Sequence, residues 1–380
     1  MKNFLVTVMI LLSFTLCGCY DFQEIDKSAY VIALGIDKGE NGYNYTFQIS
    51  SPLAMGGGGE VGSMGEGEEN SRVENIIIGS DSLSDARANL NNFLSKKINL
   101  SHLKIIVFSE EVTKIGLSPH LPFLLREREI RPNTRLAVSA SSAEDFLKGI
   151  NPALEANTAE YYDLVFENGQ TFSPDKTLWE FVNEQETFAS ALPCGIMSTA
   201  SKSDDFAKGD TPLRISTSKS EFSGLYLIKD YKFAGKLTPA QSRTFALLSG
   251  EIDEAEFGVS NGSGNHSVKI FPVNKSDFHM RQTDTSTTIF CRSSFLTEIN
   301  SSDASINIPL IKEILDREIY SLFTVLHNSG CDILNIGNIQ KRECKTAKEW
   351  ENLNWNTNFN TFSFMPETTI IISKTDSNPI

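Results

Sequence analysis

The sequence predicts a multi-domain protein of the α+β (mixed α/β) class, in which each domain is a mostly antiparallel or mixed sheet flanked by helices. Its 380 residues are enough for about two or three domains with substantial hydrophobic cores. Hydrophobic residues make up 40% and charged residues 22% of the chain, as in folded globular proteins. Strand and helix patterns follow one another along the chain, and no fixed-period repeat is present.

The chain begins with an apolar segment that resembles a bacterial lipoprotein signal peptide. After Lys2, residues 4–16 are almost uninterrupted apolar residues, a run too short to span a bilayer. The run ends in Leu16-Cys17-Gly18-Cys19, a lipobox pattern. We therefore expect removal of residues 1–18, lipidation of Cys19 with S-diacylglycerol and an N-acyl chain, and a soluble body on the extracytoplasmic face of the membrane. An ordinary secretory signal followed by a coincidental cysteine is the alternative.

Residues 19–198 are expected to form an N-terminal α/β region, because strand and helix patterns alternate there. Apolar alternation and short buried runs predict strands at Tyr30–Ile36, Tyr43–Ser50, Glu74–Ile78, Leu103–Phe108 and Thr134–Ser139. Helical spacing predicts helices at Leu83–Leu94, in short pieces through Arg128, and at Ala143–Lys148, Pro152–Gln170 and Thr177–Glu186. Ser82 or Ser84 can cap the first helix. The glycine-rich acidic segment 56–69 is expected to be a surface loop, and a split into two subdomains near residues 130–150 stays open.

The polar segment 199–220 is expected to link this region to a C-terminal α+β domain at residues 221–380. Thr238-Pro239-Ala240-Gln241 predicts a capped helix that ends at Gly250. Further helices are predicted at Ile308–Leu326 and Ala347–Leu353, and strands at Phe222–Ile228, Tyr231–Ala234, His266–Val273, Ser286–Glu298 and Thr368–Ser373. Because these strands come in runs, we expect an antiparallel sheet with packed helices.

The charge balance argues against some partners. The net charge is −14, and removal of residues 1–18 takes away one of the 34 basic residues and none of the 48 acidic ones, which leaves −15. Nucleic acid needs patches of lysine and arginine, so it is not an expected partner. An acidic chain is also poorly suited to adhere to anionic lipid. We therefore expect the membrane contact to depend on the lipid anchor alone.

The cysteines beyond the lipobox do not form a metal-binding pattern. Cys194, Cys291, Cys331 and Cys344 are scattered without a CxxC pair. Outside the cytoplasm a disulfide is permitted, and Cys331 and Cys344 are the nearest pair in sequence. Free buried thiols are the favoured interpretation, because a large core needs no covalent cross-link.

No catalytic constellation emerges from the motifs. Gly258-Val259-Ser260-Asn261-Gly262 matches the GxSxG nucleophile elbow, but the residues after it do not favour the helix that such an elbow requires. A glycine- and asparagine-rich turn is the preferred interpretation of Ser260. The five histidines form no HExxH motif, and the glycine run 56–59 lacks the lysine of a phosphate-binding loop. The charged run from Arg126 to Arg131 is typical of a solvated helix face. We expect no catalytic residue, no metal and no cofactor.

Several blocks of residues together resemble a known family. They are the opening Cys19–Ile25, then Ala29 with Gly35-Ile36-Asp37, the stretch His102–Leu147, and finally Cys331–Gly337 with Trp350. In this order the chain resembles the C subunit of bacterial spore germinant receptors, the Ger(x)C lipoproteins, over nearly its full length. Tyr20 stands where the family pattern has tryptophan, and the acidic glycine loop 56–69 is an elaboration of this chain.

The resemblance implies a non-catalytic, lipid-anchored subunit that is needed for nutrient-triggered spore germination. Its implied partners are a membrane-embedded A subunit and a transporter-like B subunit, and its implied location in spores is the inner membrane. The resemblance also implies several α/β domains, each a sheet flanked by helices. Two other functions stay under consideration: a lipid-anchored solute-binding protein of a transporter, which would be built from two similar βαβ lobes, and a serine hydrolase that uses Ser260.

Overall fold

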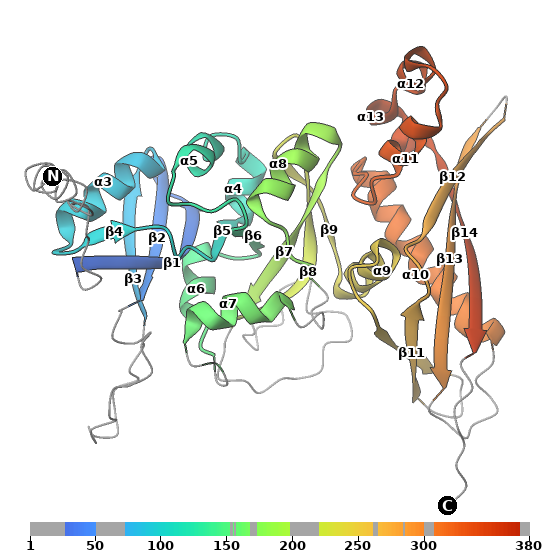
Figure 1. Ribbon diagram of the computed structural model, residues 1–380, viewed down its shortest axis with the longest axis horizontal. Coiled ribbons are helices and arrows are strands. Elements are labelled where there is room, and N and C mark those ends of the chain that lie inside the picture. The colour runs from blue at the N-terminus through green and yellow to red at the C-terminus, as the bar shows by residue number, and fades with distance from the viewer. Residues whose placement is uncertain are drawn as a thin grey trace, which may run out of the picture.

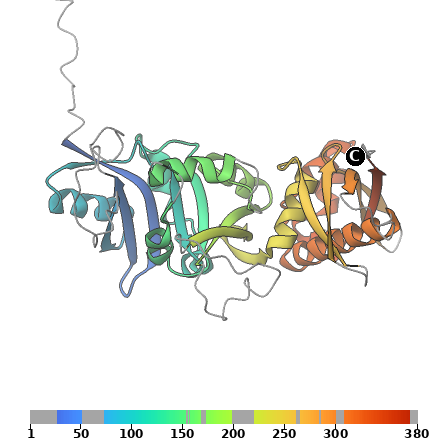
Figure 2. The same ribbon diagram turned by 90° about the horizontal axis from the view of Figure 1, so that it is seen from below.

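The computed structural model describes residues 27–50, 73–152, 155, 157–167, 173–197, 220–260, 265–283, 286–299 and 308–372. It contains one sheet of nine strands and one of five, which lie side by side along the long axis of the molecule (Figures 1 and 2). Helices flank both sheets, so the predicted mixed α/β fold class is confirmed. The predicted signal peptide, Cys19, the loop 56–69 and most of the linker lie outside the described residues.

The first sheet has parallel strands at its centre and antiparallel strands at both ends. Its order is β3-β2-β1-β5-β6-β7-β8-β9, and the short β4 pairs with β1. The pairs β1–β5, β5–β6 and β6–β7 are parallel, whereas β2, β3, β8 and β9 pair in antiparallel fashion. The strands are β1 (Ser28–Lys38), β2 (Tyr43–Ser50), β3 (Val73–Ser80), β4 (Lys97–Asn99), β5 (Ile105–Ser109), β6 (Arg135–Ser139), β7 (Ser190–Met197), β8 (Ser220–Lys229) and β9 (Lys232–Leu237).

Helices cover both faces of this sheet. On β5, Ile106 and Phe108 face one hydrophobic core, and Ile105 and Val107 face another. Both faces of a parallel strand are buried when helices pack on each, which explains why β5 begins with four consecutive apolar residues, Ile105–Phe108. The helices of this half are α3 (Leu83–Phe93), α4 (Glu110–Ile115), α5 (Leu121–Arg126), α6 (Ala143–Gly149), α7 (Thr158–Glu167) and α8 (Leu178–Thr187).

Local capping chemistry sets several helix boundaries. The Ser82 hydroxyl accepts from the Asp85 backbone N–H at 3.1 Å, so Ser82 rather than Ser84 begins α3. Thr238 and Gln241 form the predicted capping box of α9 (Pro239–Ser249), which ends at Gly250 with φ +69°. In contrast, α7 begins at Thr158, later than the predicted start at Pro152.

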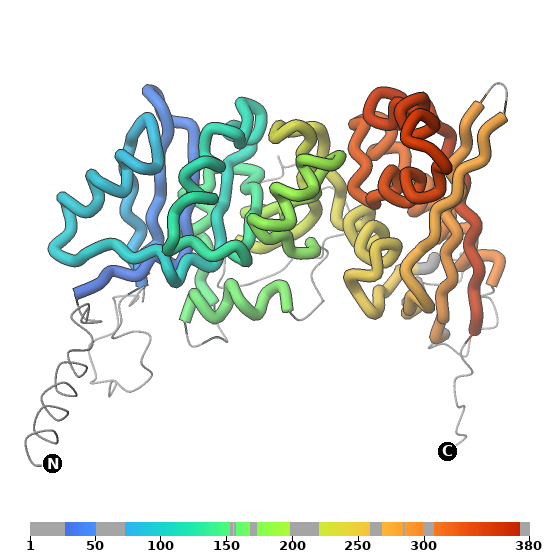
Figure 3. Tube along the Cα trace, turned by 45° about the horizontal axis from the view of Figure 1, so that its top comes forward, coloured from blue at the N-terminus to red at the C-terminus, as the bar shows by residue number. Residues whose placement is uncertain are grey.

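The second sheet has helices on one face only. Its order is β10-β11-β13-β12, all antiparallel, and β14 pairs with β13 in parallel. Figures 1 and 3 show its helices gathered on the side that faces the first sheet, and none of the described residues forms a helix on the opposite face. The elements are β10 (Ala255–Ser260), β11 (Asn265–Pro272), β12 (Asp277–Gln282), β13 (Thr287–Ile299), β14 (Ser363–Ile372), α10 (Ile308–Ser329), α11 (Ile336–Glu343), α12 (Ala347–Leu353), α13 (Trp355–Asn358) and the 3-10 helix Phe359–Thr361.

The change from one sheet to the other comes later in the chain than the expected linker. Strands β8 and β9, which the expected division places in the C-terminal domain, pair with β7 in the first sheet. Glu110 of α4 also ties them there, because its carboxylate accepts from Tyr226 of β8 at 2.5 Å and binds Lys236 of β9. Burial opposes this charge, but these hydrogen bonds and one from Lys114 outweigh it and lower the pKa of Glu110 to about 2. The polar segment 199–220 therefore leads from β7 into β8, which are neighbouring strands of the same sheet.

Candidate functional site

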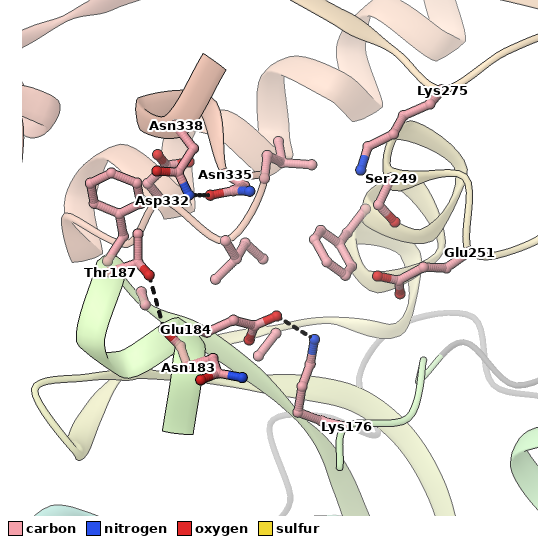
Figure 4. Close-up of a pocket in the computed structure, with 16 residues that line it drawn as sticks. Lys176, Asn183, Glu184, Thr187, Ser249, Glu251, Lys275, Asp332, Asn335 and Asn338 are labelled. Carbon is pink, nitrogen blue, oxygen red and sulfur yellow. Dashed lines mark hydrogen bonds and ion pairs between the residues drawn. The ribbon is translucent and has the colours of Figure 1, made fainter. Parts of the chain in front are cut away.

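A cleft separates the end of α8 and strand β7 from α9 and the segment that leads into α11. It has a cavity volume of about 270 Å³. Figure 4 shows polar side chains from both halves of the chain around it. These polar residues are Lys176, Asn183, Glu184, Thr187, Ser249, Glu251, Lys275, Asp332, Asn335 and Asn338.

Several polar groups of this cleft pair with one another. The Lys176 ammonium lies 2.6 Å from the Glu184 carboxylate (Figure 4). Burial opposes the charge on Lys176, but the attraction of Glu184 outweighs burial and raises the pKa of the lysine. Asn338 donates to the Asn335 side chain at 2.6 Å. Lys176, Glu184, Asn335 and Asn338 are therefore each paired within the cleft. Burial raises the pKa of Glu251, which also lines it.

Asp332 is a buried carboxylate at the base of the cleft. It accepts from the backbone N–H of Ile336 at 2.9 Å, from that of Gly337 at 2.6 Å and from the Trp355 indole N–H at 3.1 Å. Burial raises the pKa of Asp332 to about 6, although these hydrogen bonds oppose the rise. The carboxylate caps α11 in place of Asn335, which has φ +60° and makes no side-chain cap. Asp332 thus joins α11 to α13.

Gly337 lets aromatic side chains close the junction between the two halves. A Cβ atom at this position would lie 2.5 Å from the Phe188 ring and 2.6 Å from the Trp355 indole nitrogen. Phe188 ends α8, and its ring centroid lies 6.4 Å and 6.5 Å from those of Trp350 and Trp355. The block Cys331–Gly337, which carried part of the family resemblance, therefore holds the second half of the chain against the first.

We expect Gly337→Ala to destabilise the protein by about 1–3 kcal/mol, because the new methyl group must displace rigid aromatic rings. Gly258→Ala is the matched control, because nothing lies within 4 Å of a Cβ atom there. Denaturant unfolding of both variants and the wild type measures the difference. Equal stability of the two variants would contradict the proposed tight packing at the junction.

The block of Ala29 with Gly35-Ile36-Asp37 has a similar structural role on β1. Asp37 is buried, and its carboxylate accepts from the backbone N–H groups of Ala143 at 2.7 Å and Glu144 at 2.9 Å. At Gly35, a Cβ atom would lie 3.1 Å from Leu147 of α6. These residues hold α6 against the first sheet.

The middle block contains a charge network and an aromatic contact. Glu129 accepts from Arg87 of α3 at 3.0 Å and from the Leu100 backbone N–H at 2.9 Å. The His102 ring packs edge-on against Tyr30 of β1 at a centroid distance of 4.7 Å. The run from Arg126 to Arg131 is therefore more than a solvated helix face, because Glu129 joins α3 and the residue that follows β4 to the segment after α5.

The GxSxG residues do not form a nucleophile elbow. Gly258, Val259 and Ser260 belong to β10, and Ser260 pairs with Asn265 at the start of β11. A nucleophile elbow requires a helix after the turn, whereas here a second strand follows. The described part of the match is therefore the end of a strand, and Asn261 and Gly262 of the expected turn lie outside the described residues.

The other candidate groups are dispersed. His120 is buried against Tyr43, and burial lowers its pKa to about 4. The cysteines Cys194, Cys291, Cys331 and Cys344 are free thiols, and the first three are buried. Among the described residues, no group of three His, Cys, Asp or Glu side chains could hold a metal ion. In the same part of the chain, no helix is long and apolar enough to cross a membrane.

Comparison with known proteins assigns the family. Residues 21–194 match the model for the spore germination protein N-terminal domain, and residues 223–376 match that for the C-terminal part of B3/GerAC-like spore germination proteins. The chain belongs to the GerAC family of spore germination proteins. Both halves of the molecule, and the blocks that join them, are thus parts of one family architecture.

Two curated relatives and one solved structure are similar to this GerAC family chain. The candidate spore germination protein YfkR of Bacillus subtilis (strain 168) is 26% identical over 276 residues, which cover 71% of this chain and 67% of YfkR. Spore germination protein KC of the same organism is 27% identical over 154 residues, which cover 40% and 37% of the two chains. The crystal structure of the GerBC protein matches with a TM-score of 0.54 and 15% identity over 90% of this chain and 97% of GerBC. This last match shows a shared fold.

Proposed function

We propose that this protein is the C subunit of a spore germinant receptor. In this role it is a non-catalytic subunit, anchored through lipid on Cys19 to the extracytoplasmic face of the inner spore membrane, beside the integral-membrane A and B subunits. The family models over residues 21–194 and 223–376 carry the proposal. The fold shared with GerBC over nearly all of that chain supports it.

The chemistry of the described residues supports a non-catalytic role. The polar groups of the cleft include the Lys176–Glu184 ion pair and the Asp332 cap. Ser260 lies in a hairpin strand. The family blocks around Asp37 and Gly337 hold helices in place, as a scaffold subunit requires.

The alternative of a solute-binding protein is less well supported. Such proteins bind their ligand between two similar lobes of βαβ units. Here the first sheet is mixed with helices on both faces, whereas the second is mainly antiparallel with helices on one. Calorimetry with nutrient amino acids and sugars distinguishes the two functions. Tight stoichiometric binding by this protein alone would favour the solute-binding alternative.

Deletion of the gene tests the proposed function directly. Spores without this protein should fail to germinate in response to the nutrient of this receptor, and a wild-type copy should restore the response. The A and B subunits should co-purify with the restored protein from spore membranes. Normal nutrient germination in the deletion strain, with every paralogous receptor removed, would contradict the proposal.

A further inference from the structure

The acidic charge of this protein is unevenly distributed. In a chain of net charge −14, residues 86–109 contain four basic residues and no acidic one. This stretch includes most of α3 and all of β4 and of β5. At its centre, Phe93 at the end of α3 is 72% exposed, and Lys96 and Lys97 are exposed beside it. We name Phe93, Lys96 and Lys97 the basic patch.

The lysines of the basic patch differ from the other cations of this stretch. Arg87 binds Glu127 and Glu129 at 2.5 Å and 3.0 Å, and Lys104 binds Asp163 at 2.6 Å. With the residues that the structure describes, Lys96 and Lys97 make no ion pair. Glu127 and Glu129 both pair with Arg87 rather than with Lys96 or Lys97, so neither lysine of the patch is occupied by them.

The basic patch lies close to the predicted anchor point. Lys97 of β4 stands opposite Ser28, the first residue of β1, in a parallel pair. Ser28 follows Cys19 by nine residues, which can span at most about 30 Å. Figure 1 shows α3 and β4 at one end of the long axis and the second sheet at the other. A membrane that holds lipid on Cys19 is therefore within reach of the basic patch and lies at this end of the molecule.

We propose that the basic patch rests on anionic lipid beside the anchor and so orients the protein on the membrane. An exposed aromatic ring enters the interface readily, and neighbouring lysines bind the headgroup phosphates. Each cation near an anionic leaflet strengthens such binding roughly fivefold. The proposal depends on the proposed lipid attachment at Cys19, since the tether raises the local concentration of lipid to about the millimolar range, at which a weak contact forms.

This proposal changes the expectation that the membrane contact depends on the anchor alone. That expectation used the net charge of the whole chain. Charges more than about 8–10 Å away are screened at physiological salt, so a surface acts through its local charge. The sequence between Cys19 and Ser28 also carries Asp21, Glu24 and Asp26, so these carboxylates are the alternative partner for the two lysines that the experiment tests.

The test uses the lipidated protein in vesicles of phosphatidylcholine, with and without phosphatidylglycerol. A fluorescent probe is placed beside the patch at Asn92→Cys, or on exposed α12 at Asn352→Cys as the matched control, and Cys344→Ser removes the half-exposed native thiol. We expect a lipid-dissolved quencher to reach the probe at residue 92 only when phosphatidylglycerol is present, and not to reach the probe at residue 352.

Charge reversal completes the test. Lys96→Glu with Lys97→Glu should weaken the lipid contact about 30-fold or more while the protein stays in the vesicle fraction. Lys345→Glu with Lys348→Glu, an equal change on exposed lysines of the other half, should have no effect. Vesicle-bound protein whose residue-92 probe stays in water would overturn the basic patch and leave the anchor intact. In that case the neutral substitutions Asp21→Asn, Glu24→Gln and Asp26→Asn are added to the same protein. If they bring the residue-92 probe into contact with lipid, the acidic segment had occupied the two lysines. Protein absent from the vesicles would overturn the lipid attachment itself.

Discussion

Replacement of Cys19 with alanine should leave an unprocessed or mislocalised precursor and abolish nutrient-triggered germination through this receptor. The thiol of Cys19 is the predicted acceptor of the diacylglycerol group, and the described part of the chain offers no membrane-spanning helix in its place. Two acyl chains suffice for stable anchoring, at about 0.8 kcal/mol for each buried CH₂ group. Mass spectrometry of the N-terminus, fractionation of spore membranes and a germination assay measure the three parts of this result.

Cys17→Ala is the matched control for Cys19→Ala. Cys17 lies two residues upstream, within the segment expected to be removed, and alanine is as small as the cleavage region demands. This variant should be processed, anchored and active. Wild-type membrane retention and germination of the Cys19→Ala protein would disprove lipid anchoring at this residue.

Replacement of Asp332 with alanine should cost about 3 kcal/mol of stability at neutral pH. It leaves three buried donors without their acceptor: the N–H groups of Ile336 and Gly337 and the Trp355 indole. Because these donors belong to α11 and α13, both helices should loosen at the junction with the first sheet. Denaturant unfolding followed by tryptophan fluorescence measures the effect, since Trp355 contacts Asp332 directly.

The pH dependence of stability gives an independent check on Asp332. Burial raises its pKa to about 6 from the ordinary value of 3.8, so the folded protein binds this proton more tightly than the unfolded chain. The stability that protonation of Asp332 adds is therefore fully present below about pH 4 and is lost as the pH rises through about 6, whereas its three accepted hydrogen bonds persist at neutral pH. The Asp332→Ala protein should lack this part of the pH dependence, whereas Asp253→Ala, at an exposed site, should keep it. Identical pH profiles for all three proteins would contradict the assignment.

Sequence patterns predicted most helices and many strands, because their signals lie within a few residues of each other. The Thr238–Gln241 capping box and the left-handed Gly250 set both ends of α9. The apolar stripe of α10 from Ile311 to Leu326 is buried as its spacing indicates. The family resemblance likewise used short blocks in a fixed order, and the family models confirmed it.

Other features were outside the reach of local patterns. Strand β7 contains Pro193 and Gly195, which usually interrupt strands, and the fold accommodates them at an irregularity in its pairing with β8. Strands β4, β10 and β12 were not predicted either. The assignment of β8 and β9 to the first sheet depends on contacts such as Glu110 with Tyr226, 116 residues apart. The capping role of Asp332 had a weak local signal, an aspartate four residues before a helical run.

The chain alone therefore predicted the export motif, which stays a prediction, and the mixed α/β composition and family membership, which are confirmed. All three are properties of residue order and short-range spacing. The three-dimensional arrangement established which sheet each strand joins, that the blocks around Asp37 and Gly337 hold helices in place, and that Lys96 and Lys97 stand beside the start of β1. These properties depend on contacts between residues far apart in the chain. The spacing of apolar residues along the chain does not encode these contacts, because residues far away in the sequence decide which strands pair and which surfaces are buried.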